Sequence, residues 1–168
     1  MKTTSKKILF GILIIINCTA IFYFSNQIAD NSSQQSSRVV ELVSDILPTI
    51  KKMQEPKKTV IKKNIITPIV RKTAHFLIYA MLGIWTINFI NTFKKLKTSK
   101  KIILSMLFCM LYAITDEIHQ TFISGRSGEI RDLLIDSLGA LTGMMLILLL
   151  GKVMSKIINK QYNIKKLK

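Results

Sequence analysis

One segment of the chain, residues 115–143, concentrates side chains that could perform acid–base or metal chemistry. It holds one of the two histidines and five of the nine acidic residues of the sequence, namely His119, Asp116, Glu117, Glu129, Asp132 and Asp136. Apolar runs that look membrane-spanning flank it on both sides. Ionisable groups at such a place are costly and seldom lack a partner or a task. The segment is therefore the first candidate for a functional site.

The first half of this segment predicts a polar helix face. Asp116, His119 and Gln120 stand at i, i+3 and i+4, which places them on the same side of a helix. Glu117 is rotated by about 100° from Asp116. We expect the first three side chains to face a common site, and Glu117 to reach a neighbouring helix.

The second half predicts another such face. Asp132, Asp136, Gly139 and Gly143 stand at i, i+4, i+7 and i+11. Two glycines at this spacing let membrane helices approach closely. We expect that close packing to bring the two carboxylates against the preceding helix, residues 102–122.

His75 extends the predicted site to a third helix, because it begins another apolar run at the depth expected of His119 and Asp132. Arg126 lies in the turn between the two polar helix faces. Together the candidate site residues are His75, Asp116, Glu117, His119, Gln120, Arg126, Asp132 and Asp136.

The residue types leave four uses of this site open. A buried ion-pair network could fix the register of the helices. Carboxylates and imidazoles could bind a divalent cation. They could also serve as general acid and base towards a lipid-linked substrate, with Arg126 or Arg131 holding a phosphate or carboxylate. Finally, the site could bind a polar ligand without chemistry. No particular metal, cofactor or catalytic activity follows from the residues alone.

The composition indicates a membrane protein. Nearly half of the residues, 49%, are apolar, yet the formal net charge is +16. Lysine clusters at the ends of apolar runs explain both values, since basic residues flank membrane spans on the cytoplasmic side. A nucleic-acid-binding module would instead interleave basic and aromatic residues on a soluble surface. We therefore predict contact with the lipid bilayer and none with nucleic acid.

The apolar runs predict an all-α, polytopic membrane protein with four transmembrane helices in a single domain, residues 1–168. The predicted spans are residues 8–24, 74–93, 102–122 and 133–150, each close to the length that crosses a bilayer. Residues 25–73 would form an extracytoplasmic loop that includes an amphipathic helix at about residues 39–50, ended by Pro48, and a basic stretch at residues 51–63.

The orientation follows from the lysines. The short connection between the second and third spans carries Lys94, Lys95, Lys97, Lys100 and Lys101. A short loop with this many lysines is predicted to lie in the cytoplasm, because cytoplasmic loops carry an excess of basic residues. The loop 25–73 is then placed outside although it is also basic, which conflicts with the same rule. The N-terminus and the tail, residues 151–168, are accordingly placed in the cytoplasm, and the polar site near the outer surface of the plasma membrane.

The motif residues also carry a family resemblance. They are Arg71-Lys72-Thr73-Ala74-His75-Phe76, Tyr79, Leu82, Asp116-Glu117, His119-Gln120, Phe122, Gly125-Arg126, Gly128, Asp132, Asp136, Gly139 and Gly143, with Phe24-Ser25-Asn26-Gln27 after the first span. This pattern resembles the VanZ-like family of small bacterial membrane proteins over nearly the whole chain. The resemblance implies a four-span fold, and its best-known member is associated with low-level resistance to teicoplanin and related glycopeptide antibiotics.

No settled catalytic mechanism comes with this resemblance. What it implies for this chain is a cell-envelope protein that contributes to tolerance of teicoplanin-type glycopeptides through an outward-facing His/Asp/Glu/Arg site. An envelope lipid or a glycopeptide-type ligand would be its partner. The alternative is an intramembrane enzyme that modifies a lipid-linked envelope precursor.

Overall fold

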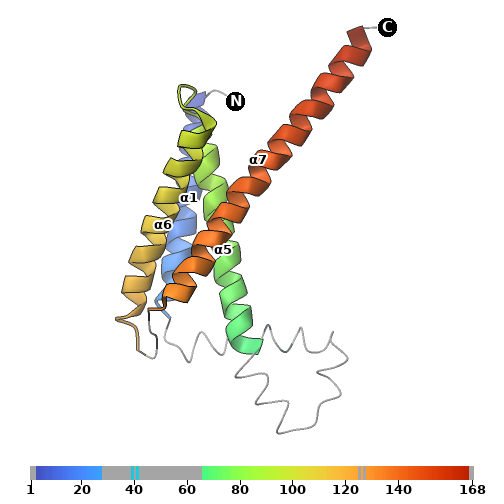
Figure 1. Ribbon diagram of the computed structural model, residues 1–168. Coiled ribbons are helices and arrows are strands. Elements are labelled where there is room, and N and C mark those ends of the chain that lie inside the picture. The colour runs from blue at the N-terminus through green and yellow to red at the C-terminus, as the bar shows by residue number, and fades with distance from the viewer. Residues whose placement is uncertain are drawn as a thin grey trace, which may run out of the picture.

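The computed structural model describes residues 3–27, 39, 41, 66–124, 126 and 128–166. This part of the chain forms the helices α1 (Thr3–Ser25), α5 (Thr67–Asn91), α6 (Thr98–Gln120) and α7 (Ile130–Lys166), shown in Figure 1. All four are long and apolar enough to cross a membrane. The prediction of an all-helical membrane protein with four spans is confirmed. Apart from Val39 and Glu41, the predicted amphipathic helix and the basic stretch 51–63 lie outside the described residues.

Local sequence explains how these helices tolerate polar residues. Pro68 lies in the first turn of α5, where its missing N–H group is not needed. Within the apolar spans, Thr86 and Asn88 donate side-chain hydrogen bonds to the carbonyls four residues before them, at 2.7 and 2.8 Å. Thr142 does the same on α7, at 2.7 Å. Such bonds satisfy a side chain inside its own helix, so these residues need no aqueous contact.

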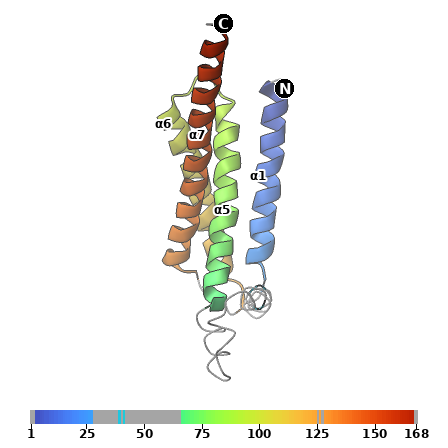
Figure 2. The same ribbon diagram turned by 90° about the vertical axis from the view of Figure 1, so that its right-hand side faces the viewer.

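Helix α5 is the central helix, because its contacts with the other three helices are together more extensive than those of any other helix. Its most extensive contact is with α7, and Figure 2 shows the two side by side. The contact depends on glycines from both helices. A Cβ atom at Gly139 would lie 2.3 Å from the Phe76 carbonyl oxygen, and one at Gly143 would lie 2.0 Å from that of Ala80. From the α5 side, a Cβ atom at Gly83 would lie 2.2 Å from the Ala140 carbonyl oxygen.

The partner of this glycine face differs from the sequence expectation. Close packing was expected against the third span, but Gly139 and Gly143 lie against the second, α5. The physical reason is on α5, where Phe76 and Ala80 present their backbone to the glycines and Gly83 continues the same surface. Two membrane helices can approach this closely only where both contact surfaces are lined by small residues or exposed backbone.

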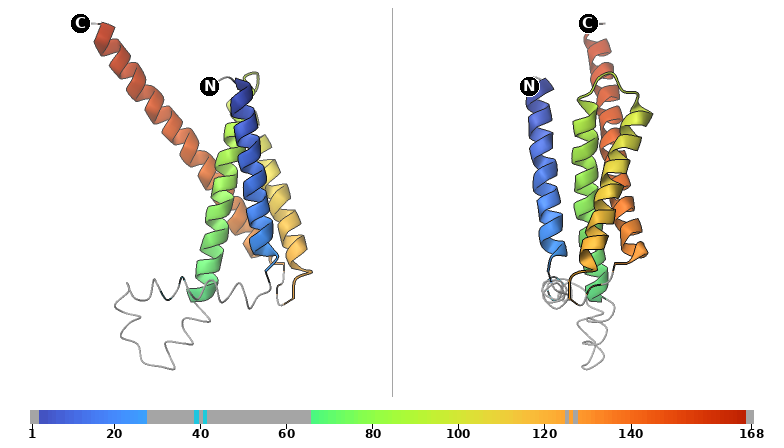
Figure 3. Two further views of the ribbon diagram at one scale, coloured as in Figure 1. Left: turned by 180° about the vertical axis from the view of Figure 1, so that it is seen from behind. Right: turned by 90° about the vertical axis from the view of Figure 1, so that its left-hand side faces the viewer.

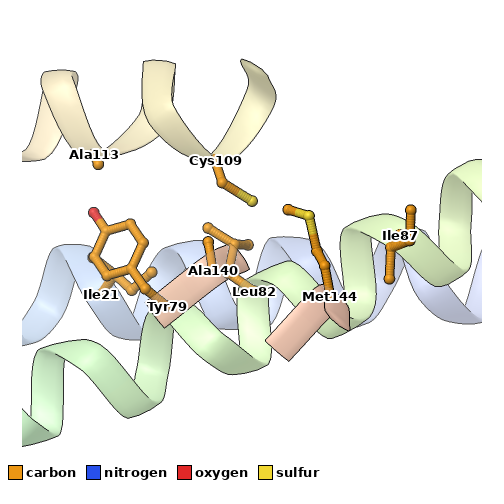
Figure 4. Close-up of a cluster of buried hydrophobic side chains, with 8 residues drawn as sticks. All are labelled: Ile21, Tyr79, Leu82, Ile87, Cys109, Ala113, Ala140 and Met144. Carbon is orange, nitrogen blue, oxygen red and sulfur yellow. The ribbon is translucent and has the colours of Figure 1, made fainter. Parts of the chain in front are cut away.

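A small apolar core joins all four helices (Figure 4). Its buried members are Ile21, Tyr79, Leu82, Ile87, Cys109, Ala113, Ala140 and Met144. Large apolar side chains elsewhere are exposed, for example Ile15 at 66%, Leu107 at 52% and Leu146 at 52%. In water such a surface would drive aggregation, whereas lipid tails cover it without cost. The exposed apolar surface therefore indicates contact with the bilayer.

The two ends of the bundle differ in character. At one end, the start of α1 lies beside the basic connection between α5 and α6, and the Lys7 Nζ atom lies 4.4 Å from the centre of the Phe93 ring. The C-terminal part of α7 leaves the bundle towards the same end (Figures 1 and 3). The opposite end brings together the last turns of α1 and α6 and the first turns of α5 and α7. The candidate site residues lie at that opposite end.

Candidate functional site

Asp116 connects three helices. Its Oδ2 atom accepts hydrogen bonds from Ser25 Oγ on α1 at 3.0 Å, from Tyr79 OH on α5 at 3.3 Å and from Gln120 Nε2 on α6 at 3.2 Å. The Asp116 side chain is buried. A buried carboxylate needs such donors to offset the loss of its hydration. Asp116 therefore has a structural explanation and a fixed orientation.

Glu117 faces in another direction, as its rotation around the helix predicted. Its Oε2 atom accepts a hydrogen bond from the backbone N–H of Glu129 at 2.9 Å, just before α7 begins. A carboxylate at this position satisfies a free N–H group at a helix N-terminus and interacts favourably with the helix dipole. A Cβ atom at Gly128 would lie 3.0 Å from the Glu117 backbone carbonyl oxygen, which explains the glycine in this turn. Glu117 thus anchors the start of α7.

Asp132 is paired with Lys72. The Lys72 ammonium group contacts the Asp132 carboxylate, and it lies 3.4 Å from Glu129 Oε2. This pair joins the first turn of α7 to the second turn of α5. Its side chains are partly exposed, so solvent weakens the attraction and the pair contributes little to stability.

Asp136 is different from the other three acids. Its side chain is completely buried, and neither carboxylate oxygen has a hydrogen-bond partner among the described residues. The imidazole of His75 lies close by, with its Nδ1 atom 3.8 Å from Asp136 Oδ1, but it is charged only when protonated. That distance is too long for a hydrogen bond. An unsatisfied carboxylate at this depth is expensive, so its position calls for a ligand or a chemical role.

His75, Asp116 and Asp136 form a compact group of possible metal ligands. One ring nitrogen and one oxygen from each carboxylate all lie within 4.8 Å of one another. Beside them is a small pocket with a free volume of about 10 Å³, whose lining includes Arg71, His75 and Asp136. A space of this size admits about one water molecule or one ion.

His119 does not join this group. Its ring stacks on Phe22 of α1, with ring centres 4.8 Å apart, and its buried Nε2 atom has no hydrogen-bond partner in the part of the chain that the structure describes. His119 and Gln120 lie about 100° apart around the helix, on either side of the direction of Asp116. Gln120 consequently reaches the Asp116 side chain, whereas His119 turns towards α1.

Residues 10–151 match the sequence model of a family described as VanZ/LLP1. The chain belongs to this family. The resemblance of the motif residues to VanZ-like proteins is thereby confirmed, and the match includes α5 and α6 and the parts of α1 and α7 that lie within residues 10–151. No curated protein sequence and no solved structure gives a significant match to the chain.

In this VanZ/LLP1 protein, Arg126 lies at the rim of the site. It donates hydrogen bonds to Gln120 Oε1 at 3.3 Å and to the Phe24 carbonyl at 3.2 Å. Burial, and then the neighbouring Arg71, lowers the pKa of the Arg126 guanidinium, while the nearby carboxylates oppose that shift. Arg126 links the α6–α7 turn to the end of α1, and through Gln120 it connects with Asp116.

Three residues of the VanZ/LLP1 site were not among the predicted site residues. They are Ser25, Lys72 and Tyr79, which bond to Asp116 or Asp132. Tyr79 stands four residues after His75 and so shares its helix face, a signal that spacing alone could have provided. Lys72 lies on the same helix, one turn before His75. Ser25 gives no such signal, because its role depends on where α1 ends relative to α6.

Proposed function

We propose that this VanZ/LLP1 protein acts in the bacterial plasma membrane and contributes to tolerance of teicoplanin-type glycopeptide antibiotics through its polar site. The family supports the envelope role. Asp136 supports the role of the site, because Asp116, Glu117 and Asp132 each accept a hydrogen bond or form an ion pair, whereas neither oxygen of Asp136 has a hydrogen-bond donor among the described residues. This side chain carries the proposal.

The size of the pocket favours an indirect mechanism. Clefts that enclose drug-sized ligands have volumes of roughly 300–1,000 Å³. The pocket beside His75 and Asp136 has about 10 Å³ of free volume and cannot enclose a glycopeptide. The protein would therefore change the envelope that the antibiotic meets, for instance by holding the headgroup of an envelope lipid at the rim near Arg71.

The charge distribution supports an outward-facing site. The start of α1, the connection between α5 and α6 and the extension of α7 carry lysines and lie towards one end of the bundle. Positively charged segments of this kind remain in the cytoplasm. We accordingly place both termini inside the cell and the site at the external end.

Expression of the protein in a glycopeptide-susceptible bacterium should raise the inhibitory concentration of teicoplanin more than that of vancomycin. In cells that express Asp136→Ala, the inhibitory concentration of teicoplanin should fall to that of cells with an empty vector, because this variant lacks the unsatisfied carboxyl group. Broth dilution measures both values, and a fluorescent C-terminal fusion checks that equal amounts reach the membrane.

Glu129→Gln is the matched control. It also removes one negative charge from the same end of α7, but the Glu129 side chain is about half exposed and lies outside the proposed site. Cells that express Glu129→Gln should tolerate teicoplanin as well as cells that express the wild type. Equal tolerance in Asp136→Ala and wild-type cells would contradict the proposed role of the site.

The pairing of His75 with Asp136 favours one alternative, an enzyme acting on a lipid-linked envelope precursor. An imidazole beside a buried carboxylate can transfer protons during catalysis. An enzyme must leave a changed product, so mass spectrometry of lipid-linked intermediates should show a mass shift in expressing cells that disappears with His75→Gln. Identical lipid profiles in all strains would exclude this alternative and leave the binding role.

A further inference from the structure

We infer that His75, Asp116 and Asp136 bind one divalent transition-metal cation, Zn²⁺ or Mn²⁺, between α5, α6 and α7. This inference names the ligand of the proposed site and so rests on the proposal that the site is functional. It follows from the spacing of three potential ligands, the missing partners of Asp136 and the support around Asp116.

The spacing fits a shared cation. Two ligands of one tetrahedral Zn²⁺ ion, each at about 2.1 Å, lie about 3.4 Å apart. His75 Nδ1 and Asp136 Oδ1 are 3.8 Å apart, and the full set of three donor atoms lies within 4.8 Å. Small side-chain rotations that move the donor atoms by a few tenths of an ångström to about one ångström would bring all three to coordinating distance.

The burial of Asp136 supplies independent evidence. Its side-chain exposure is 0%, it lines the small pocket, and both its oxygens lack hydrogen-bond donors among the described residues. A buried ionised carboxylate costs several kcal/mol unless it is paired or coordinates a metal. A dication between the three donor atoms, beside the pocket, would compensate for both Asp136 and Asp116, which a single imidazole at 3.8 Å does not.

Asp116 has the support expected of a metal ligand. Carboxylates that bind metals are usually held by further hydrogen bonds, which fix their direction. Here the hydroxyls of Ser25 and Tyr79 and the amide of Gln120 all donate to Oδ2. Tyr79 is completely buried, and so the direction of this carboxylate is set by the core of the bundle.

The nearby basic residues do not neutralise the group. Lys72 contacts Asp132 and Glu129, and Arg126 donates to Gln120 and the Phe24 carbonyl. Arg71 lines the pocket, but no hydrogen bond from any described residue reaches Asp136. The basic residues in the described part of the chain therefore do not supply the missing partner of Asp136, which leaves its oxygens available to a cation.

The donor types select among metals. The imidazole favours Zn²⁺ and the two carboxylates also suit Mn²⁺, so a set that mixes them is compatible with either ion, whereas Mg²⁺ and Ca²⁺ are bound mainly by oxygen ligands. The pocket has room for about one water molecule, which could complete the coordination. That arrangement, with three protein ligands and one open position, is typical of metal sites that bind a further group.

Metal analysis of the purified full-length protein tests the inference. Protein with a tag that lacks histidine is stripped with a chelator in detergent, dialysed against Zn²⁺ or Mn²⁺, and assayed by atomic emission. We expect one equivalent per chain for the wild type. Asp136→Asn and His75→Gln should each weaken binding at least tenfold. Tyr79→Phe, which removes a donor to Asp116, should weaken it by about 10–100-fold.

Glu129→Gln should bind like the wild type. Co²⁺ in place of Zn²⁺ adds a spectroscopic check, because its visible absorption should appear in the wild type and disappear in Asp136→Asn. Protection of the buried Cys109 thiol from labelling shows that a variant is folded. His75→Gln provides a second test if Asp136→Asn is not folded.

Absence of bound metal in the wild type, or equal binding by the wild type and folded Asp136→Asn or His75→Gln, would overturn the inference. The proposed function can fail separately. Metal binding without any change in antibiotic tolerance would refute the function alone, whereas tolerance that depends on Asp136 in a protein that binds no metal would refute the cation site alone.

Discussion

Gly143→Ala should destabilise the protein, although alanine is the better helix former. A Cβ atom at this position would lie 2.0 Å from the Ala80 carbonyl oxygen and 2.7 Å from its carbonyl carbon, so α5 and α7 must separate. Overpacking of this kind costs about 1–3 kcal/mol. For a chain of this size the loss corresponds to roughly 3–10 °C in Tm. Thiol labelling of the buried Cys109 during heating in detergent measures it.

Gly151 provides a control on the same helix. Nothing lies within 4 Å of a Cβ atom built there, so Gly151→Ala should leave Tm unchanged or raise it slightly, as helix propensity predicts. Combining Gly139→Ala with Gly143→Ala should lower Tm further than either change alone. Equal Tm values for the alanine variants at 143 and 151 would show that α5 and α7 do not pack as described.

Asp116→Leu should cause the largest loss of stability among the changes at the polar site. It removes the acceptor of three hydrogen bonds, so the hydroxyls of Ser25 and Tyr79 and the NH₂ group of Gln120 lose their shared acceptor while they remain buried. Each unsatisfied group costs about 1–3 kcal/mol. Asp116→Asn keeps one acceptor oxygen and should lose much less. The same Cys109 labelling assay measures both.

A double-mutant cycle isolates the contribution of Tyr79. In Asp116→Leu combined with Tyr79→Phe, the unpaired hydroxyl is absent, so the double variant should be less destabilised than the sum of the two single changes. Additive losses would mean that Tyr79 and Asp116 do not interact and would remove the hydrogen bond from the description of the site.

Much of the fold could be predicted from the sequence because it depends on local patterns. The apolar lengths define four helices, and the polar residues at their ends locate the site. The separation of Glu117 from Asp116 also follows from the helical period. These features require knowledge of only one helix at a time.

The features that could not be predicted from the sequence depend on how two helices pack together. The spacing of Gly139 and Gly143 indicates close packing but cannot identify the partner, which the backbone of Phe76 and Ala80 decides. His119 shares a face with Asp116 in projection, yet its neighbour Phe22 lies far away in the sequence. The proximity of His75 to Asp136 likewise depends on the relative position of α5 and α7 along their axes.

The length of α7 has a consequence for the other side of the membrane. Its 37 residues would extend roughly 55 Å at about 1.5 Å per residue, well beyond a hydrocarbon layer of about 30 Å. The turns after Leu150 must therefore emerge among or past the lipid phosphates. There Lys152, Lys156 and Lys160 share one side of the helix, with Val153 and Ile157 beside them, so the emerging turns could lie along the membrane surface with the lysines at the lipid phosphates and the apolar side chains on the acyl chains.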